Sequence, residues 1–235
     1  MPRFAPLTCL LLANVASAGY AVGVPKQDVI AAPQRSINGI PYSTRAYWMR
    51  RANAALAELG SPCPFAAFGT VIVNHTATDG LGELVCIGAN ANSRTGNPTL
   101  HGETAAITNC TAVLTDPEGA YKMNASEALD AFSRLSLYTN AESCSMCASA
   151  IRWAGFKEYI YGTAIDTLLA QGWGQIRITS LEVFRQSIDL PTQTRLIGEV
   201  LTNETDPYFS WQYNPEYPCP AGCSRLGDSC TADEK

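Results

Sequence analysis

The 235-residue sequence has little charge, a shortage of positive charge and few histidines. Lys and Arg number 16 against 21 Asp and Glu, for a net charge of -5, and charged residues make up 16 % of the chain. Because proteins that bind polyanions usually carry a basic face, this balance disfavours RNA or DNA as a partner. No apolar run reaches the roughly 18 residues that span a bilayer, which disfavours a membrane protein. With only two histidines, His75 and His101, any chemistry that needs imidazole must use one of them.

The beginning of the chain has the pattern of a secretory signal peptide over residues 1–18. Arg3 precedes an apolar run, residues 4–15, that is too short to cross a bilayer, and Ala16-Ser17-Ala18 is a small-x-small cleavage pattern. Residues 19–40 have no apolar periodicity, which indicates a linker or propeptide. We therefore expect a soluble protein that is secreted or resides in the lumen of the secretory pathway.

Cysteines and glycosylation sequons also favour an oxidising compartment. Removal of the predicted signal peptide takes away Cys9 and leaves eight cysteines, an even number. Six of them are expected to form structural disulfides, and the sequence does not determine which cysteine pairs with which: Cys63, Cys86, Cys110, Cys219, Cys223 and Cys230. Four Asn-x-Ser/Thr sequons predict N-glycosylation and hence surface positions, at Asn74, Asn109, Asn124 and Asn203.

Hydrophobic periodicity predicts one α/β domain over residues 41–190. The expected helices cover 44–59, 101–114, 144–154 and 179–184, the last with Thr179 and Glu182 as a capping box. The expected strands cover 68–74 and 83–89, which form a hairpin, then 134–139, 158–161 and a weaker 175–178. This order indicates a three-layer α-β-α fold, a mixed central sheet with helices on both faces. Residues 191–235, rich in Cys, Pro and Tyr, are expected to be a tail held by disulfides and aromatic contacts.

Two short motifs at predicted helix starts carry the ligand types of a zinc site. Cys144 and Cys147 stand three residues apart, so both thiols lie on one helix face, and the helix N-terminus favours their anionic form. One histidine, His101, would complete three protein ligands to Zn²⁺ and leave the fourth position to water, as in catalytic sites. Glu103 is the nearby carboxylate that can move the proton of that water.

Each of these residues also has an ordinary interpretation. In an exported chain the pair Cys144 and Cys147 also fits a disulfide, but the His-x-Glu motif favours zinc over that alternative and over a redox pair. His75 lies in the predicted hairpin loop and is expected at the surface. The tryptophans Trp48, Trp153 and Trp173 are expected to pack in the core or in the wall of a pocket.

His-x-Glu followed by Cys-x-x-Cys is the signature of zinc nucleobase deaminases. The chain resembles that cytidine/deoxycytidylate deaminase superfamily, and most of all its guanine deaminase and tRNA adenosine deaminase branch. The similarity runs in order from about residue 44 to 161, and more weakly to 187. It is carried by Tyr47-Trp48-Met49, residues 68–73, Gly88-Ala89-Asn90, residues 97–107, Leu137-Tyr138-Thr139, residues 142–147 and Ala150-Ile151-Arg152-Trp153-Ala154.

The resemblance assigns roles to individual residues. It implies that His101, Cys144 and Cys147 hold zinc and that Glu103 shuttles the proton. It also implies that Asn90, eleven residues before His101, hydrogen-bonds the substrate base, although an asparagine at that place equally suits a turn after a strand.

Two positions depart from the family pattern. Gly102 stands where Ala or Cys is usual, and we expect it to widen the pocket or to loosen the ligand. Ser143 replaces the proline before the first cysteine. Because serine is favoured at helix caps, Ser143 is expected to preserve the start of the helix.

These features predict a secreted zinc-dependent hydrolase, an aminohydrolase acting on a cyclic amidine of a free nucleobase or nucleoside. The Ala150-Ile151-x-Trp153-Ala154 pattern favours a guanine-type purine by resemblance. The alternative is a catalytically silent secreted protein of the same fold that binds a partner and keeps zinc for stability. Glu103 favours the enzyme, because a structural site has no use for that carboxylate. The resemblance also allows a homodimer.

Overall fold

The computed structural model describes residues 35–76 and 80–233. The predicted signal peptide and most of the predicted linker lie outside these described residues. The described end of the linker forms a small hairpin of β1 (Ser36–Ile37) and β2 (Ile40–Pro41), turned at Asn38 and Gly39. No helix in the described ranges is both long and apolar enough to cross a membrane.

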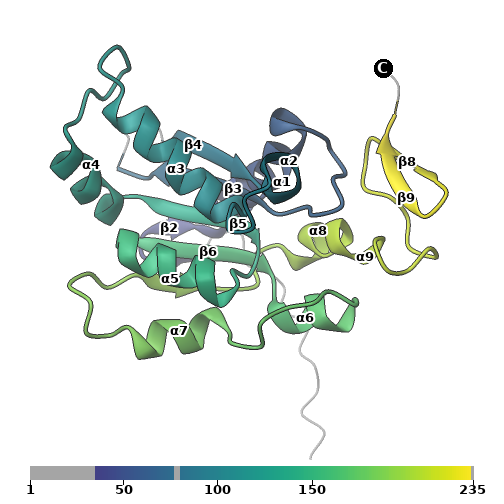
Figure 1. Cartoon of the computed structure of the whole chain (residues 1–235). Helices are drawn as coiled ribbons and strands as arrows, with labels where there is room; N and C mark the ends of the chain where they lie inside the picture. Colours follow the sequence, from purple (N-terminus) through teal and green to yellow (C-terminus); the bar gives the residue numbers. More distant parts are fainter. Residues whose placement is uncertain (1–34, 77–79, 234–235) are drawn as a thin grey trace, which may run out of the picture. The chain divides into compact units, whose positions relative to one another are not determined.

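A five-stranded mixed sheet forms the centre of the domain (Figure 1). Its strands lie in the order β4-β3-β5-β6-β7, and β3 is antiparallel to both of its neighbours, whereas β5, β6 and β7 are parallel. The strand bounds are β3 (Gly69–Asn74), β4 (Glu83–Ala89), β5 (Ser136–Ala141), β6 (Glu158–Thr163) and β7 (Arg195–Ile197). The predicted hairpin and the predicted mixed sheet are confirmed.

Helices cover both faces of the sheet, which confirms the three-layer prediction (Figure 1). On one face lie α3 (Gly102–Thr115), α4 (Ala125–Ala131), η1 (Phe132–Arg134), α5 (Ser145–Ala154) and α7 (Ser180–Gln186). On the other lie α1 (Tyr42–Leu59) and α8 (Thr202–Thr205). Within β3, Ile72 packs toward α3 while Val71 and Val73 pack toward α1, because successive side chains point to opposite faces. This explains why β3 is apolar throughout.

The predicted strand 175–178 is wrong. That segment has no regular structure, and the fifth strand is instead β7, which pairs with β6 beyond residue 190. Ile176 and Ile178 are exposed at 56 % and 40 %, so the β-branched side chains that suggested a strand have no sheet to pack against. The helix after this segment begins at the predicted place, and the Thr179 hydroxyl accepts the Glu182 N–H at 3.2 Å. The reciprocal bond from the Thr179 N–H to the Glu182 side chain, which a capping box requires, is not among the hydrogen bonds of this cap.

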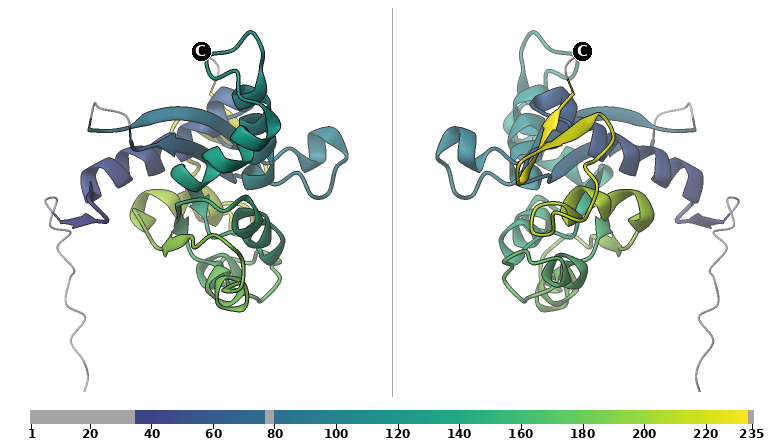
Figure 2. Two further views of the ribbon diagram at one scale, coloured as in Figure 1. Left: turned by 90° about the vertical axis from the view of Figure 1, so that its left-hand side faces the viewer. Right: turned by 90° about the vertical axis from the view of Figure 1, so that its right-hand side faces the viewer.

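Disulfides attach the C-terminal tail to the domain. The pairs are Cys63–Cys223, Cys86–Cys110 and Cys219–Cys230, and among the cysteines of the described ranges Cys144 and Cys147 remain free. Cys219–Cys230 closes the hairpin of β8 (Cys223–Leu226) and β9 (Ser229–Ala232), and Cys63–Cys223 holds this hairpin beside the segment between α1 and β3 (Figure 2). The short helices α2 (Asn92–Thr95), α6 (Ile165–Ala170) and α9 (Pro207–Ser210) complete the described chain.

The four sequon asparagines lie at or near the surface. Asn109, Asn124 and Asn203 are exposed and Asn74 is half-buried. Asn124 also caps α4, where its side chain accepts the N–H groups of Ser126 and Glu127. Glycosylation itself stays a prediction.

His75 is not the surface residue that its place in a loop suggests. It is half-buried, with Nδ1 3.1 Å from the Leu81 carbonyl and Nε2 2.8 Å from the Tyr138 hydroxyl. Because a carbonyl only accepts, Nδ1 carries the proton and Nε2 accepts from Tyr138. Burial, together with the Arg45 charge, lowers the pKa of His75. This histidine therefore belongs to a polar network with Tyr138 and lies outside the cluster formed by His101 and the free cysteines.

Candidate active site

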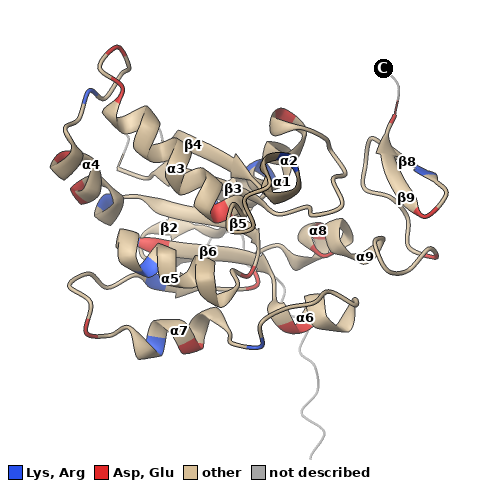
Figure 3. Ribbon diagram, viewed as in Figure 1, with Lys and Arg blue, Asp and Glu red and all other residues tan. Residues whose placement is uncertain are grey.

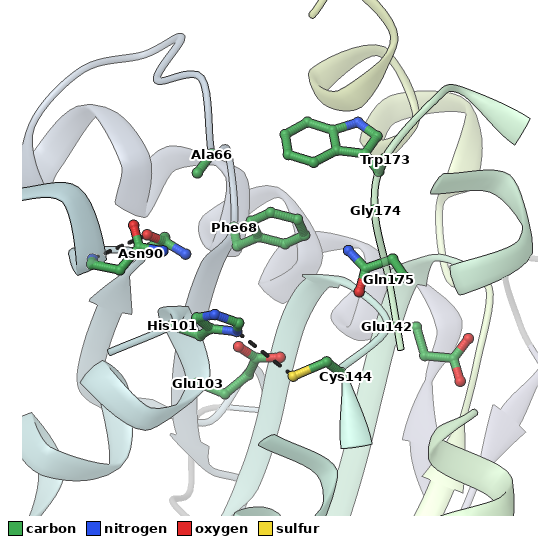
Figure 4. A pocket seen from close by; sticks show the side chains of 11 residues that line it. Ala66, Phe68, Asn90, His101, Glu103, Glu142, Cys144, Trp173, Gly174 and Gln175 are labelled. Atoms are coloured by element: carbon green, nitrogen blue, oxygen red, sulfur yellow. Dashed lines mark hydrogen bonds between the residues drawn. The ribbon is translucent and has the colours of Figure 1, made fainter. Parts of the chain in front are cut away.

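The three predicted zinc ligands meet where two helices begin. His101 is the N-cap of α3, Cys144 is the N-cap of α5, and Cys147 lies fully buried in the first turn of α5. The Nδ1 atom of His101 is 3.7 Å from the Sγ atom of Cys144 (Figure 4). The ligand atoms of all three residues lie within 4.8 Å of one another. These three residues therefore form a cluster that could hold a metal ion.

This cluster fits zinc in both distance and chemistry. With Zn–N near 2.0 Å and Zn–S near 2.3 Å, tetrahedral zinc separates its nitrogen and sulfur ligands by roughly 3.5 Å. The His101–Cys144 separation is close to that value. One imidazole and two thiols are donors that zinc prefers, and no disulfide in the described part of the chain uses these two thiols.

The two thiols are electrostatically unequal. A hydrogen bond with the Cys147 thiol, followed by contact with His101, lowers the pKa of the Cys144 thiol. The same hydrogen bond, together with burial, raises the pKa of Cys147. The Cys144 contact in turn raises the pKa of His101. Zinc binds thiolates and neutral imidazole, so binding of a metal ion at this cluster would release protons from its ligands.

Glu103 places a buried carboxyl beside the cluster. It lies in the first turn of α3, is 4 % exposed, and lines the same pocket as His101 and Cys144 (Figure 4). Burial raises the pKa of its carboxyl. A carboxyl whose pKa is raised toward neutrality can both take up and release a proton, as a general acid–base group must.

The pocket above the cluster has an apolar wall and several amide groups. Its volume is about 200 Å³. The rings of Phe68 and Trp173 lie 5.4 Å apart between centroids, close to edge-on, and form the apolar part (Figure 4). Amide side chains are contributed by Asn90, Asn92 and Gln175. A planar, polar-edged ring is the kind of ligand that suits such a lining.

Asn90 lies at this pocket, just after β4, and serves the turn as well. Its N–H donates to the Phe68 carbonyl at 2.9 Å, and its Oδ1 accepts the Asn92 N–H at 3.2 Å. The turn thus uses one lone pair of the side-chain oxygen. The second lone pair and the amide nitrogen of Asn90 can meet a ligand.

Sequence reasoning missed Gln175 and the role of Glu142. Glu142 is buried, and its carboxylate accepts the N–H of Ile165 at 3.0 Å and the N–H of Ser180 at 2.8 Å. One side chain thereby holds both ends of the segment that carries Trp173 and Gln175. The glycines on either side of Trp173 were a signal that this tryptophan lies in a loop rather than in a helix.

The structure shows what the residue at each departure from the family pattern contacts. A Cβ on Gly102 would lie 2.6 Å from the backbone oxygen of Phe68, so the glycine serves close contact between α3 and the start of β3 and does not widen the pocket. Ser143 does not cap α5, because Cys144 is the N-cap and no side chain makes a cap hydrogen bond. The Ser143 N–H instead donates to the Tyr159 hydroxyl at 2.7 Å.

Comparison with known proteins places this site in a family. The family model described as "Cytidine and deoxycytidylate deaminase zinc-binding region" matches residues 42–163. A guanine deaminase of Bacillus subtilis strain 168 is 30 % identical over 159 residues, which are 66 % of this chain and 83 % of the relative. A probable cytosine deaminase of Schizosaccharomyces pombe is 28 % identical over 102 residues, 43 % of this chain and 50 % of the relative.

Solved structures give lower similarity. A guanine deaminase from Nitrosomonas europaea is 16 % identical, with a TM-score of 0.48, over 83 % of this chain and 97 % of its own. A structure from work on tRNA:A34 deaminases is 18 % identical, with a TM-score of 0.47, over 70 % of this chain and 99 % of its own.

The family match covers more than half of the chain and includes all three cluster residues and Glu103. The branch suggested by the motifs is also that of the guanine deaminase relative. The chain therefore belongs to the zinc-binding cytidine and deoxycytidylate deaminase family.

Proposed function

We propose that the protein is a secreted, zinc-dependent hydrolytic deaminase that releases ammonia from a free purine base or nucleoside, with guanine-type purines favoured. Its family and its relatives support a nucleobase deaminase. One observation carries the catalytic part of the proposal: the buried Glu103 carboxyl stands beside the His101, Cys144 and Cys147 cluster in the same pocket.

His101, Cys144 and Cys147 would hold the metal ion. When bound there, zinc supplies Lewis acidity, which brings the pKa of a water molecule to about 7. Glu103 accepts a proton from the attacking water and delivers it to the ring nitrogen next to the amine-bearing carbon. A second proton transfer through Glu103 makes the amine a leaving group. The C–N bond then breaks, ammonia departs, and the ring carbon keeps the oxygen of the water.

The pocket favours a small, flat substrate. Phe68 and Trp173 supply flat apolar surfaces, and the amides of Asn90, Asn92 and Gln175 supply both donors and acceptors for the edge of a base. The guanine-type preference is supported by the name of the relative with 30 % identity. In the view of Figure 3 basic residues are scattered among acidic ones, which together with the net charge of -5 supports a small molecule over RNA.

Secretion is supported by separate observations. The signal-peptide pattern, three disulfides and three exposed sequon asparagines agree with an oxidising, glycosylating compartment. The zinc thiols escape oxidation in such a compartment if metal occupies them.

The test measures ammonia release by the full exported protein against guanine, adenine, cytosine and their nucleosides, with Glu103→Gln as the matched variant. We expect release with a guanine-type compound. Because the buried carboxyl is the proton carrier, Glu103→Gln should lower kcat by at least about 100-fold, the usual contribution of a general acid–base group, while zinc content stays equal. Activity that survives in the variant would contradict the proposed role, and silence of both proteins at full zinc content would favour the binding-protein alternative.

A further inference from the structure

Trp173 is held between two distant parts of the chain. Its ring centroid lies 5.6 Å from that of Phe65, which precedes β3, and 5.4 Å from that of Tyr213 in the C-terminal tail. Its indole N–H donates to the carbonyl of Phe209 at 2.8 Å. Although it lines the pocket, Trp173 is only 8 % exposed. Its position in the pocket wall therefore depends on groups outside its own segment.

Contacts with the tail help to hold the segment around Trp173 in place. Residues 171–179 follow the end of α6 and form no helix or strand. The Gln171 side-chain amide donates to the Ser210 hydroxyl at 2.9 Å. Gly172 has a φ of +99°, and a Cβ there would lie 3.1 Å from the Cβ of Tyr213, so the backbone passes directly against the tail.

The tail is also bound to the stretch of chain that carries Phe68. The Gln212 side chain donates to the carbonyl of Phe65 at 3.0 Å, and the Cys63–Cys223 disulfide joins the tail to the same stretch of chain. That stretch contributes Ala66 and Phe68 to the pocket. Residues 207–213, together with this disulfide, thus connect the Phe68 side of the pocket to the Trp173 side.

We propose that the tail, tied by Cys63–Cys223, is a positioning element that sets the spacing between Phe68 and Trp173, and that Trp173 is a specificity-determining contact for the planar ring of the substrate. This inference rests on the proposed deamination and deepens it. The family match ends at residue 163, so both Trp173 and the tail lie outside the region that the family model describes.

A wall that contacts the ring equally in the bound substrate and in the transition state affects KM more than kcat. Removing the tether with Cys63→Ser/Cys223→Ser is expected to raise KM about tenfold, while kcat stays within about twofold and zinc content stays equal. Replacing both cysteines together avoids an unpaired thiol. The matched control is Cys219→Ser/Cys230→Ser, which removes a disulfide from the same tail but leaves the tether, and its KM should stay within about twofold.

The contact itself is tested by two substitutions of Trp173. Because stacking of a base on an aromatic ring contributes substantially to binding, Trp173→Ala should raise KM roughly tenfold and Trp173→Phe should restore most of the loss. Binding of the base to the inactive Glu103→Gln protein, followed by intrinsic fluorescence, gives the same comparison without turnover. If the tether variant does not fold, Gln171→Ala tests the positioning role of the tail in its place, because it removes the hydrogen bond from the Trp173 segment to Ser210.

The outcomes separate the two proposals. Deamination with an unchanged KM in the tether variant, or an equal rise in both disulfide variants, would overturn the positioning role of the tail. An unchanged KM in Trp173→Ala would overturn the contact. If no base is deaminated and none binds to Glu103→Gln, the proposed function fails, and the inference falls with it.

Discussion

Glu142 shows how a single buried carboxylate can organise a pocket without lying at its chemical centre. Besides the two backbone N–H groups at Ile165 and Ser180, it accepts the Ser180 hydroxyl at 2.9 Å. Hydrogen bonds to a charged group are stronger than those between neutral groups. The loop that brings Trp173 and Gln175 to the pocket is therefore anchored at both ends by the residue two positions before Cys144.

Glu142→Gln tests this anchoring. Glutamine has nearly the same shape, but one of its terminal atoms becomes an N–H donor that faces a backbone donor, so we expect a loss of about 2 kcal/mol in the free energy of unfolding. KM should rise as well, because the loop loosens. Urea unfolding and steady-state kinetics measure both effects. Glu182→Gln, at an exposed position on α7, is the control and should change stability by less than about 0.5 kcal/mol. Equal behaviour of the two variants would contradict the anchoring role.

At this scale the sequence predicts the parts of the site that local motifs encode. His101, Glu103, Cys144 and Cys147 lie in two short motifs at helix starts. The strands before these helices, β4 and β5, are both antiparallel to β3, so they end at the same edge of the sheet. Gln175 comes from an irregular loop more than 25 residues after Cys147, and the placement of this loop depends on contacts with Glu142 and the tail. No local pattern encodes such contacts.

At the scale of elements, the packing of α3 on β3 depends on Gly102. The carbonyl of Phe68 and the Thr70 hydroxyl both lie near the position of a Cβ on this residue, at 2.6 and 3.2 Å. The first of these distances is too short for any real Cβ, and its partner is rigid backbone. α3 would have to move outward, and His101, as its N-cap, would move with it.

Gly102→Ala is therefore expected to destabilise the protein, although alanine is usually the better residue in a helix by about 1 kcal/mol. We expect a loss of roughly 1–3 kcal/mol, the range for overpacking, together with faster removal of zinc by a chelator. Thermal unfolding and a chelation time course measure the two effects. Gly60→Ala is the control, because nothing lies within 4 Å of a Cβ there. A stabilised Gly102→Ala protein would show that α3 adjusts without strain.

Elements with strong periodicity could be predicted, and elements without it could not. The helix expected over 44–59 is α1 (Tyr42–Leu59), and the hairpin strands agree within about one residue. β7 has three residues at the edge of the sheet, too few for alternation to be visible. The wrong strand at 175–178 was suggested by two isoleucines that the fold leaves exposed. The β propensity of a short segment does not make it a strand when its side chains have no sheet to pack against.

At the scale of the whole molecule, a buried ion pair joins four parts of the chain. Arg45 on α1 and Glu158 on β6 are 1 % and 0 % exposed, and their closest charged atoms lie 3.2 Å apart. Asn38 of the N-terminal hairpin donates to the same carboxylate at 2.7 Å, and the Arg45 guanidinium also reaches Tyr138 on β5, at 3.4 Å. Although burial opposes ionisation, the hydrogen bonds from Arg45, Asn38 and Ser136 hold the pKa of Glu158 below its usual value.

The sign of the pH dependence follows from that lowered pKa. Glu158 contributes its full stability above its unfolded-state pKa of about 4.3 and loses it as pH falls through the lower folded-state value. In Arg45→Met the cation is gone while burial remains, so the folded-state pKa rises above the unfolded one and the ionised carboxylate becomes destabilising. The penalty of the substitution should therefore grow with pH, to about 3–5 kcal/mol near neutrality, and shrink below about pH 4. Urea unfolding of both proteins across that range measures this difference.

The control is Arg45→Met/Glu158→Leu, which removes the unpaired charge and should recover most of the lost stability. A penalty that stays the same at every pH would show that Arg45 acts by packing rather than by pairing with Glu158.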